Sequence, residues 1–297
     1  MARTKDKELV FVPLGGVGEI GMNFALYGFG PAANREWIIV DCGVTFPGPD
    51  LPGVDLVLPD TRFIENEVKN LRGMVITHAH EDHYGAILDI WPNLGCPVWM
   101  SPFTAGLMEA KRQSEYQRID VPVNIFRAGQ TFDLGPFRIE PVPVTHSIPE
   151  PYSLAITTEA GTVIHTGDWK FDAEPTIGPL TDEDRLKALG DVGVLAMICD
   201  STNAMREGES PTEREVCDSL EKLIEKAAGR VVITTFSSNV GRIRSIAEAA
   251  RDAGRQVLIL LPEIALSAAW KQRFQDRFGV MPAEWHSDVA PGRKRRA

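Results

Sequence analysis

Apolar and polar positions follow two different rhythms along the chain. Short apolar runs rich in β-branched and aromatic residues, bounded by Gly and Pro, predict strands. These runs cover residues 8–14, 22–28, 36–41, 73–77, 97–100, 136–142, 153–158, 162–166 and 193–199. Apolar residues at helical spacing predict helices over residues 61–70, 83–91, 103–113 and 182–189. This order indicates an α/β (α+β) protein with two sheets packed between helices.

The pattern changes after residue 203. Residues 206–211 are polar and contain turn formers, so they read as a linker. A helix over residues 212–228, a strand over 230–236, a helix over 239–251 and a strand over 256–261 follow. Strands alternating with helices are typical of a parallel-sheet domain. We therefore expect a first domain over residues 1–207 and a second segment over residues 208–255.

The histidines point to a chemistry. Three of the six lie within residues 77–83, in the pattern HxHxDH, on a loop between a predicted strand and a helix. Imidazole and carboxylate groups are the usual ligands of Zn²⁺ and Mn²⁺. Residues two apart on extended backbone point the same way, so His78 and His80 can hold one ion. Asp82 and His83 are offset and can hold a second.

Two downstream residues complete a candidate site. His146 and Asp168 each follow a predicted strand, and taken singly they read as a hydrogen-bonded histidine and a turn residue. Taken with the HxHxDH motif they predict a two-metal hydrolase, with His146 on the first ion and Asp168 bridging both. His165 is expected either to support the metal ligands from behind or to be structural.

These residues resemble the metallo-β-lactamase superfamily, and further segments resemble its ribonuclease J family, in the β-CASP branch. The resemblance covers residues 8–255. The segments that carry it are PLGGVGEIGMN (residues 13–23), VDCG (40–43), VDLVLPD (54–60), HTGDWK (165–170), DSTNA (200–204) and TTFSSNV (234–240).

The resemblance implies an αββα sandwich followed by the beginning of an α/β β-CASP cap domain. It also implies hydrolysis of RNA, with 5′→3′ exonucleolytic and endonucleolytic cutting, by water that two divalent cations activate. Zn²⁺ is the expected metal, with Mn²⁺ as the alternative. Asp82, Asp168 and Asp200 are the implied catalytic carboxylates, and Ser237, Ser238 and Asn239 are candidates for binding phosphate.

Ribonuclease J proteins are longer, and two of their histidine motifs have no counterpart in this sequence. We therefore expect a truncated family member with a tightly held first ion, a weakly held second ion and an impaired proton donor at Asp200. The family forms homo-oligomers, which we regard as doubtful here. Residues 256–297 resemble a fragment of the primosomal replication-restart helicases, which suggests a gene fusion or an assembly error.

Three other interpretations stay open. Residues 16–21 match GxGxxG, with Asp41 about 20 residues later, as in a dinucleotide-binding fingerprint. That interpretation requires a helix after the glycines, whereas residues 22–30 read as a strand. The chain could also be another hydrolase of the same fold, such as a lactonase or thioester hydrolase, or an inactive metal-binding remnant.

Composition limits the remaining possibilities. Asp and Glu (41) outnumber Lys and Arg (31) in the 297 residues, so RNA must be bound through local basic groups or metal ions rather than the overall field. No apolar run approaches the ~18 residues of a membrane span, and the charged N-terminus has no signal-peptide pattern, which suggests a cytoplasmic protein. No two of the four cysteines form a CxxC pair, and we expect all four to be reduced and buried.

Overall fold

The computed structural model describes residues 7–114, 119–258 and Gln275. The chain divides into two compact units, Met1–Ala253 and Gly254–Ala297, and nearly all of the described residues lie in the first. The expected helicase-like tail and the last part of the predicted strand 256–261 lie almost entirely outside the described residues and stay predictions.

The first sheet has six strands in the order β1-β2-β3-β4-β5-β6. Its strands β1 to β3 are antiparallel, and β3 to β6 are parallel. Their bounds are β1 (Glu8–Gly15), β2 (Phe24–Gly30), β3 (Glu36–Val40), β4 (Leu71–Val75), β5 (Val98–Met100) and β6 (Val123–Ile125). The opening strands therefore match the predicted ones closely, whereas β6 was not predicted from the sequence.

The second sheet has five strands in the order β11-β10-β9-β8-β7. All neighbours are antiparallel except β10 and β11, which run parallel. Their bounds are β7 (Phe132–Leu134), β8 (Phe137–Pro143), β9 (Tyr152–Thr158), β10 (Gly161–His165) and β11 (Ala196–Ile198). Strand β7 is three residues long, too short for a periodic signal in the sequence.

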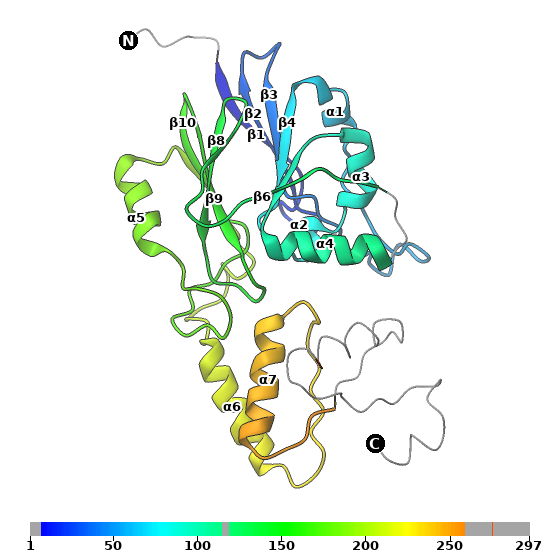
Figure 1. Ribbon diagram of the computed structural model, residues 1–297, viewed down its shortest axis with the longest axis vertical. Coiled ribbons are helices and arrows are strands. Elements are labelled where there is room, and N and C mark those ends of the chain that lie inside the picture. The colour runs from blue at the N-terminus through cyan, green and yellow to red at the C-terminus, as the bar shows by residue number, and fades with distance from the viewer. Residues whose placement is uncertain (1–6, 115–118, 259–274, 276–297) are drawn as a thin grey trace. The chain divides into compact units, whose positions relative to one another are not determined.

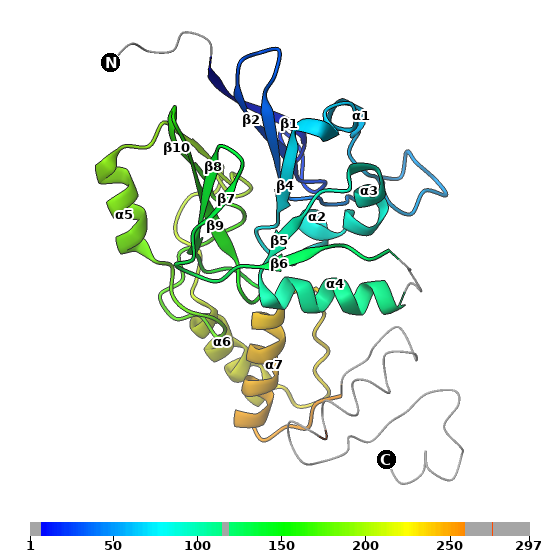
Figure 2. The ribbon, with the colours of Figure 1, turned by 45° about the horizontal axis from the view of Figure 1, so that its top comes forward.

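Helices cover the outer faces of the two sheets. In Figure 1, α1 (Arg62–Glu65), α3 (Ile87–Leu94) and α4 (Pro102–Ser114) lie beside the six-stranded sheet, and α5 (Glu183–Val192) lies beside the five-stranded one. The same layers are visible in Figure 2. The predicted αββα arrangement is therefore confirmed. Within the described residues, none of the helices is long and apolar enough to span a bilayer.

Alternation along the central strands produces two cores. In β2, Phe24 and Leu26 pack with the residues that face the helices, whereas Ala25, Tyr27 and Phe29 pack between the sheets. Successive side chains of a strand point to opposite faces, so a strand that is buried on both faces is apolar throughout. All seven residues of β2 are buried accordingly.

The chain after the second sheet forms two helices, α6 (Glu213–Lys226) and α7 (Val240–Asp252). Helix α6 begins with a capping box in which Thr212 and Glu215 bond each other's backbone N–H. The two helices pack through a small apolar cluster of Cys217, Ile224, Ala249 and Ala250. The predicted boundary at residue 207 stays a prediction, because α6 and α7 belong to the first compact unit.

Three expectations were wrong in detail. Residues 230–236 form no strand: Val232 is 91% exposed, and no strand in the described residues lies beside this segment to share its backbone hydrogen bonds. Residues 61–70 form a short helix and a separate 3₁₀ turn, Val68–Asn70. Cys199 is exposed, whereas Cys42, Cys96 and Cys217 are buried as expected, and all four are free.

Asp172 connects α6 to the end of the sandwich. Asp172 is 5% exposed, and its carboxylate accepts the N–H of Glu213 at 3.0 Å and pairs with Lys170 at 2.8 Å. Replacing a cap acceptor costs about 0.5–2 kcal/mol. We therefore predict that Asp172→Ala speeds amide hydrogen exchange in α6 and leaves β8 to β10 unchanged. Asp191→Ala, at an exposed position of α5, is the control, and equal protection of α6 in both variants would contradict the prediction.

Candidate metal centre

Three loops that follow strands deliver the candidate ligands. The backbone leaves β4 at Val75, and His78 and His80 lie on the extended segment before α2 (Glu81–Tyr84). That helix carries Asp82 and His83. His146 follows β8, and Asp168 follows β10. The motif therefore occupies the strand-to-helix loop that the sequence predicted.

Gly167 allows the loop after β10 to turn toward the other ligands. Its φ of +56° lies in the left-handed region that favours glycine. A Cβ atom at this position would lie 3.1 Å from Cβ of Thr77, which precedes His78. The close approach of these two loops places the Asp168 carboxylate beside the histidines.

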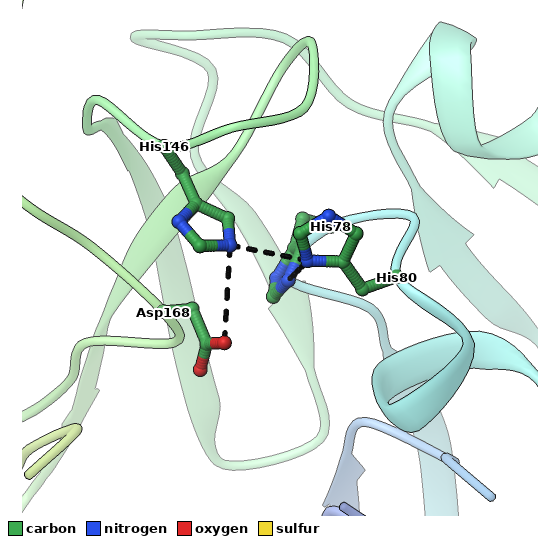
Figure 3. A group of neighbouring side chains, drawn as sticks. All are labelled: His78, His80, His146 and Asp168. Carbon is green, nitrogen blue, oxygen red and sulfur yellow. Dashed lines mark hydrogen bonds and ion pairs between the residues drawn. The ribbon is translucent and has the colours of Figure 1, made fainter. Parts of the chain in front are cut away.

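Three imidazole nitrogens converge in the first group. Nε2 of His78 and Nε2 of His146 each lie 3.1 Å from Nδ1 of His80 (Figure 3). Oδ2 of Asp168 lies 3.8 Å from Nε2 of His146. Tetrahedral ligands placed 2.0–2.1 Å from a zinc ion would be about 3.3 Å apart. The nitrogen spacing therefore fits a single divalent ion held by these four residues.

A second group adjoins the first. Nε2 of His83 lies 3.3 Å from Oδ1 of Asp168 and 3.6 Å from Oδ2 of Asp82. These three side chains form another candidate metal-binding set. Asp168 thus belongs to both groups, with one carboxylate oxygen toward His83 and the other toward His146.

Asp41 orients one histidine of each group and was missed by the sequence analysis as a site residue. Its carboxylate is 1% exposed and accepts hydrogen bonds from His83 Nδ1 at 2.7 Å and from the Thr77 hydroxyl at 2.9 Å. Because the hydroxyl proton is used there, Nδ1 of His78 donates to Thr77 Oγ1, 3.0 Å away. Both imidazoles therefore present Nε2 to the site. The sequence did contain a signal for Asp41, because this carboxylate directly follows the buried strand β3.

His80 is oriented from the other side of the site. The backbone of Ser238 makes a hydrogen bond to it, and the Ser147 hydroxyl lies 3.4 Å from its Nε2. The backbone N–H of Gly241 donates to the carbonyl of Ser147 at 3.2 Å. The segment that leads into α7 therefore contacts a candidate metal ligand directly.

Burial and charge divide the histidines into two classes. Burial, reinforced by the neighbouring histidines, lowers the pKa of His78 well below its usual value and that of His146 to about 3. Burial opposes protonation of His83 as well, but the charges of Asp41 and Asp168 outweigh it and raise its pKa well above the usual value. Burial likewise acts to raise the pKa of Asp168, and the positive His83 beside it lowers the pKa overall.

Two of the remaining predicted residues, Asp200 and Asn239, line a cavity beside this centre. The cavity has a volume of about 290 Å³, and His146, Asp168, Asp200 and Asn239 are among its lining residues. Oδ1 of Asp200 accepts two hydrogen bonds from Thr202, at 2.9 and 2.7 Å.

The residues predicted to bind phosphate occupy the turn before α7. Asn239 caps the helix by accepting the N–H of Arg242 at 2.9 Å. Ser238 is partly buried and reaches His80 through its backbone, whereas Ser237 is exposed. The structure therefore brings Ser238 and Asn239 to the site but does not place the Ser237 side chain there.

The fold bears on two other sequence interpretations. His165 lies between the sheets, with its Nδ1 2.9 Å from the Tyr27 hydroxyl, and burial lowers its pKa to about 4. Its predicted structural role fits this position. The glycine-rich residues 16–21 lead into β2 rather than into a helix, so the dinucleotide-binding interpretation is wrong.

A protein-family model, the beta-lactamase superfamily domain, matches residues 36–193. The chain belongs to the beta-lactamase superfamily. The matched residues run from β3 to the end of α5 and include every candidate metal ligand. A crystal structure of a protein of unknown function from Enterococcus faecalis aligns with 97% of this chain and 73% of that protein, at a TM-score of 0.62 and 15% identity. This likeness is one of fold alone.

Curated relatives narrow the resemblance to ribonuclease J. The chain is 64% identical over 256 residues to ribonuclease J of Sinorhizobium meliloti, covering 86% of this chain and 45% of that protein. It is 44% identical over 247 residues to ribonuclease J of Mycobacterium tuberculosis, covering 82% of this chain and 43% of that protein. The predicted family resemblance is confirmed, and the chain spans less than half the length of these relatives.

The opposite pKa shifts predict different pH responses for the two groups. His78 and His146 are neutral near pH 7, so the first ion displaces no proton from them. His83 carries a proton there, so the second ion must displace it. We predict that Zn²⁺ affinity at the second group falls by up to about tenfold for each unit by which the pH drops below the raised pKa of His83, while the first group changes little.

Calorimetric Zn²⁺ titrations at several pH values measure this difference. In an Asp41→Asn variant, which keeps His83 as a candidate ligand but removes a charge that raises its pKa, the fall in affinity should begin at lower pH. Equal pH slopes for the two ions in the parent protein would contradict the assignment of the proton to His83.

Proposed function

We propose that this chain carries the metal-dependent catalytic site of a ribonuclease and hydrolyses phosphodiester bonds in RNA. The observation that carries the proposal is the sharing of Asp168 between two adjacent groups of metal-ligating side chains. Adjacent two-metal sites are characteristic of enzymes that cleave phosphodiesters. The names of the curated relatives support RNA as the substrate. The proposal includes both 5′→3′ exonucleolytic and endonucleolytic cutting, as the family resemblance implies.

In this proposal His78, His80 and His146 would hold the first ion, Asp82 and His83 would hold the second, and Asp168 would serve both. Zn²⁺ is the preferred metal and Mn²⁺ the alternative, because the donors are imidazole and carboxylate groups with no thiolate among them. Two bound divalent ions lower the pKa of a water molecule and neutralise negative charge on the phosphate under attack.

The residues of the cavity supply the other functions. Lys170 and Arg242 line it and can donate hydrogen bonds to phosphate oxygens. Each is also held by a carboxylate, Lys170 by Asp172 at 2.8 Å and Arg242 by Glu213 at 2.8 Å. These ion pairs keep both cations at the cavity wall. They also reduce its net positive charge, which suits a substrate whose charge the metal ions largely neutralise.

Three further assignments belong to the proposal. Asp200 lines the cavity, and we assign it the role of protonating the leaving oxygen, impaired by the missing histidine motifs. Ser238 and Asn239 provide N–H, hydroxyl and amide groups for phosphate, with Ser237 at the exposed end of the same turn. Residues 208–255, with α6 and α7, represent the beginning of a β-CASP cap, next to a metallo domain over residues 1–207. The proposal places the protein in the cytoplasm and leaves homo-oligomer formation as a possibility.

The test is turnover of 5′-monophosphorylated RNA by metal-loaded protein, with Zn²⁺ and with Mn²⁺. Labels at each end of the RNA separate exonucleolytic from endonucleolytic products. We expect metal-dependent cleavage that falls by at least about 100-fold in an Asp82→Ala/His83→Ala variant, because both residues of the second group are removed. Asp191→Ala, at an exposed position of α5 away from the candidate ligands, is the control. No cleavage by protein that holds both ions, or equal cleavage by the double variant, would refute the proposal.

A further inference from the structure

The glycine-rich loop before β2 ends beside the second group of candidate ligands. Gly16, Gly18 and Gly21 all have positive φ values, of +85°, +78° and +95°. This conformation is open to glycine and strained for other residues. The loop turns the chain so that Asn23, the last residue before β2, reaches α2. The motif that resembles a dinucleotide-binding fingerprint therefore places Asn23 beside α2. The proposed function assigns no role to Asn23.

Asn23 contacts both residues that are unique to the second group. Its Nδ2 lies 3.0 Å from the backbone carbonyl of Asp82, 3.4 Å from Oδ2 of the Asp82 carboxylate and 3.1 Å from Nε2 of His83. Its backbone N–H also donates to the Asp82 carbonyl, at 2.9 Å. One residue thus holds Asp82 by two hydrogen bonds to the same oxygen.

The orientation of the Asn23 amide follows from these partners. A carbonyl oxygen only accepts hydrogen bonds, so the amide atom 3.0 Å from the Asp82 carbonyl is the nitrogen. Its second N–H is directed at the Asp82 carboxylate, because Nε2 of His83 is itself directed at the Asp168 carboxylate. When Nε2 is used to bind an ion, the carboxylate is the acceptor that remains for this N–H. Asn23 can therefore hold Asp82 in place while the second group is loaded.

Two glycines make this arrangement sterically possible. A Cβ atom at Gly43 would lie 1.7 Å from the Asp82 carbonyl, and Gly43 donates its N–H to the Asn23 carbonyl at 2.9 Å. A Cβ atom at Gly16 would lie 2.3 Å from Oδ1 of Asn23. A Cβ atom at Gly18, in the same loop, would meet nothing within 4 Å.

We propose that Asn23, positioned by the glycine-rich loop, is a positioning residue that sets the affinity of the second metal ion. The inference rests on the proposed function in that it requires the second group to bind an ion. Asn23 is not itself a ligand of the metal ion. Its side chain acts by holding the carbonyl and carboxylate of Asp82, and the glycine-rich loop acts by holding Asn23.

The test compares Asn23→Ala, Gly16→Ala and Gly18→Ala by Zn²⁺ titration of the metal-free chain, with the two ions resolved as separate binding steps. Asn23→Ala and Gly16→Ala should weaken the second step by about 10- to 100-fold and leave the first within about twofold. Gly18→Ala, which strains the same loop without touching Asn23, should match the parent. Binding of the first ion also reports that each variant is folded.

Three results would overturn the inference. An unchanged second step in Asn23→Ala would show that the amide does not set its affinity. Equal weakening of both steps, or equal effects of Gly16→Ala and Gly18→Ala, would show a general structural role of the loop. A parent chain that binds one ion only would overturn this inference together with the two-metal site, whereas the first two results leave the proposed function intact.

Discussion

The candidate site depends on one buried carboxylate. Asp41 accepts hydrogen bonds from His83 and from Thr77, and Thr77 accepts from His78, so a single anion sets the ring orientation of one imidazole in each metal group. An uncompensated buried charge is costly, and these hydrogen bonds are what make the carboxylate tolerable there. Because Asp41 follows β3 and Thr77 follows β4, the arrangement requires these two strands to be neighbours. The site therefore depends on the correct pairing of the sheet.

Charge balance explains how four imidazoles can lie together without a strong mutual repulsion. His78, His80 and His146 have lowered pKa values and are neutral near pH 7. The one histidine with a raised pKa, His83, lies between Asp41 and Asp168. The first group thus offers neutral donors, and in the second group the positive charge of His83 is compensated by carboxylates. A divalent cation can replace the His83 proton without disturbing the fold.

The sequence predicted what depends on local patterns. Strand and helix alternation gave most of the sandwich, and the spacing of His78, His80 and His83 gave the centre of the site. It could not give the role of Asp41 or Asn23, because their partners are about 40 and 60 residues away and only the pairing of strands and loops brings them together. The predicted strand 230–236 failed for the converse reason: its apolar pattern was correct, but a strand also needs a neighbour.

The most direct test is anomalous X-ray scattering at the zinc edge from crystals of the Zn²⁺-loaded chain. The account predicts a strong peak within bonding distance of Nε2 of His78, Nδ1 of His80 and Nε2 of His146, with Asp168 adjoining it. A weaker peak is predicted between Asp82, His83 and Asp168. Zinc bound elsewhere, with the three imidazoles ligating nothing, would contradict the claim that these distant side chains form a metal centre.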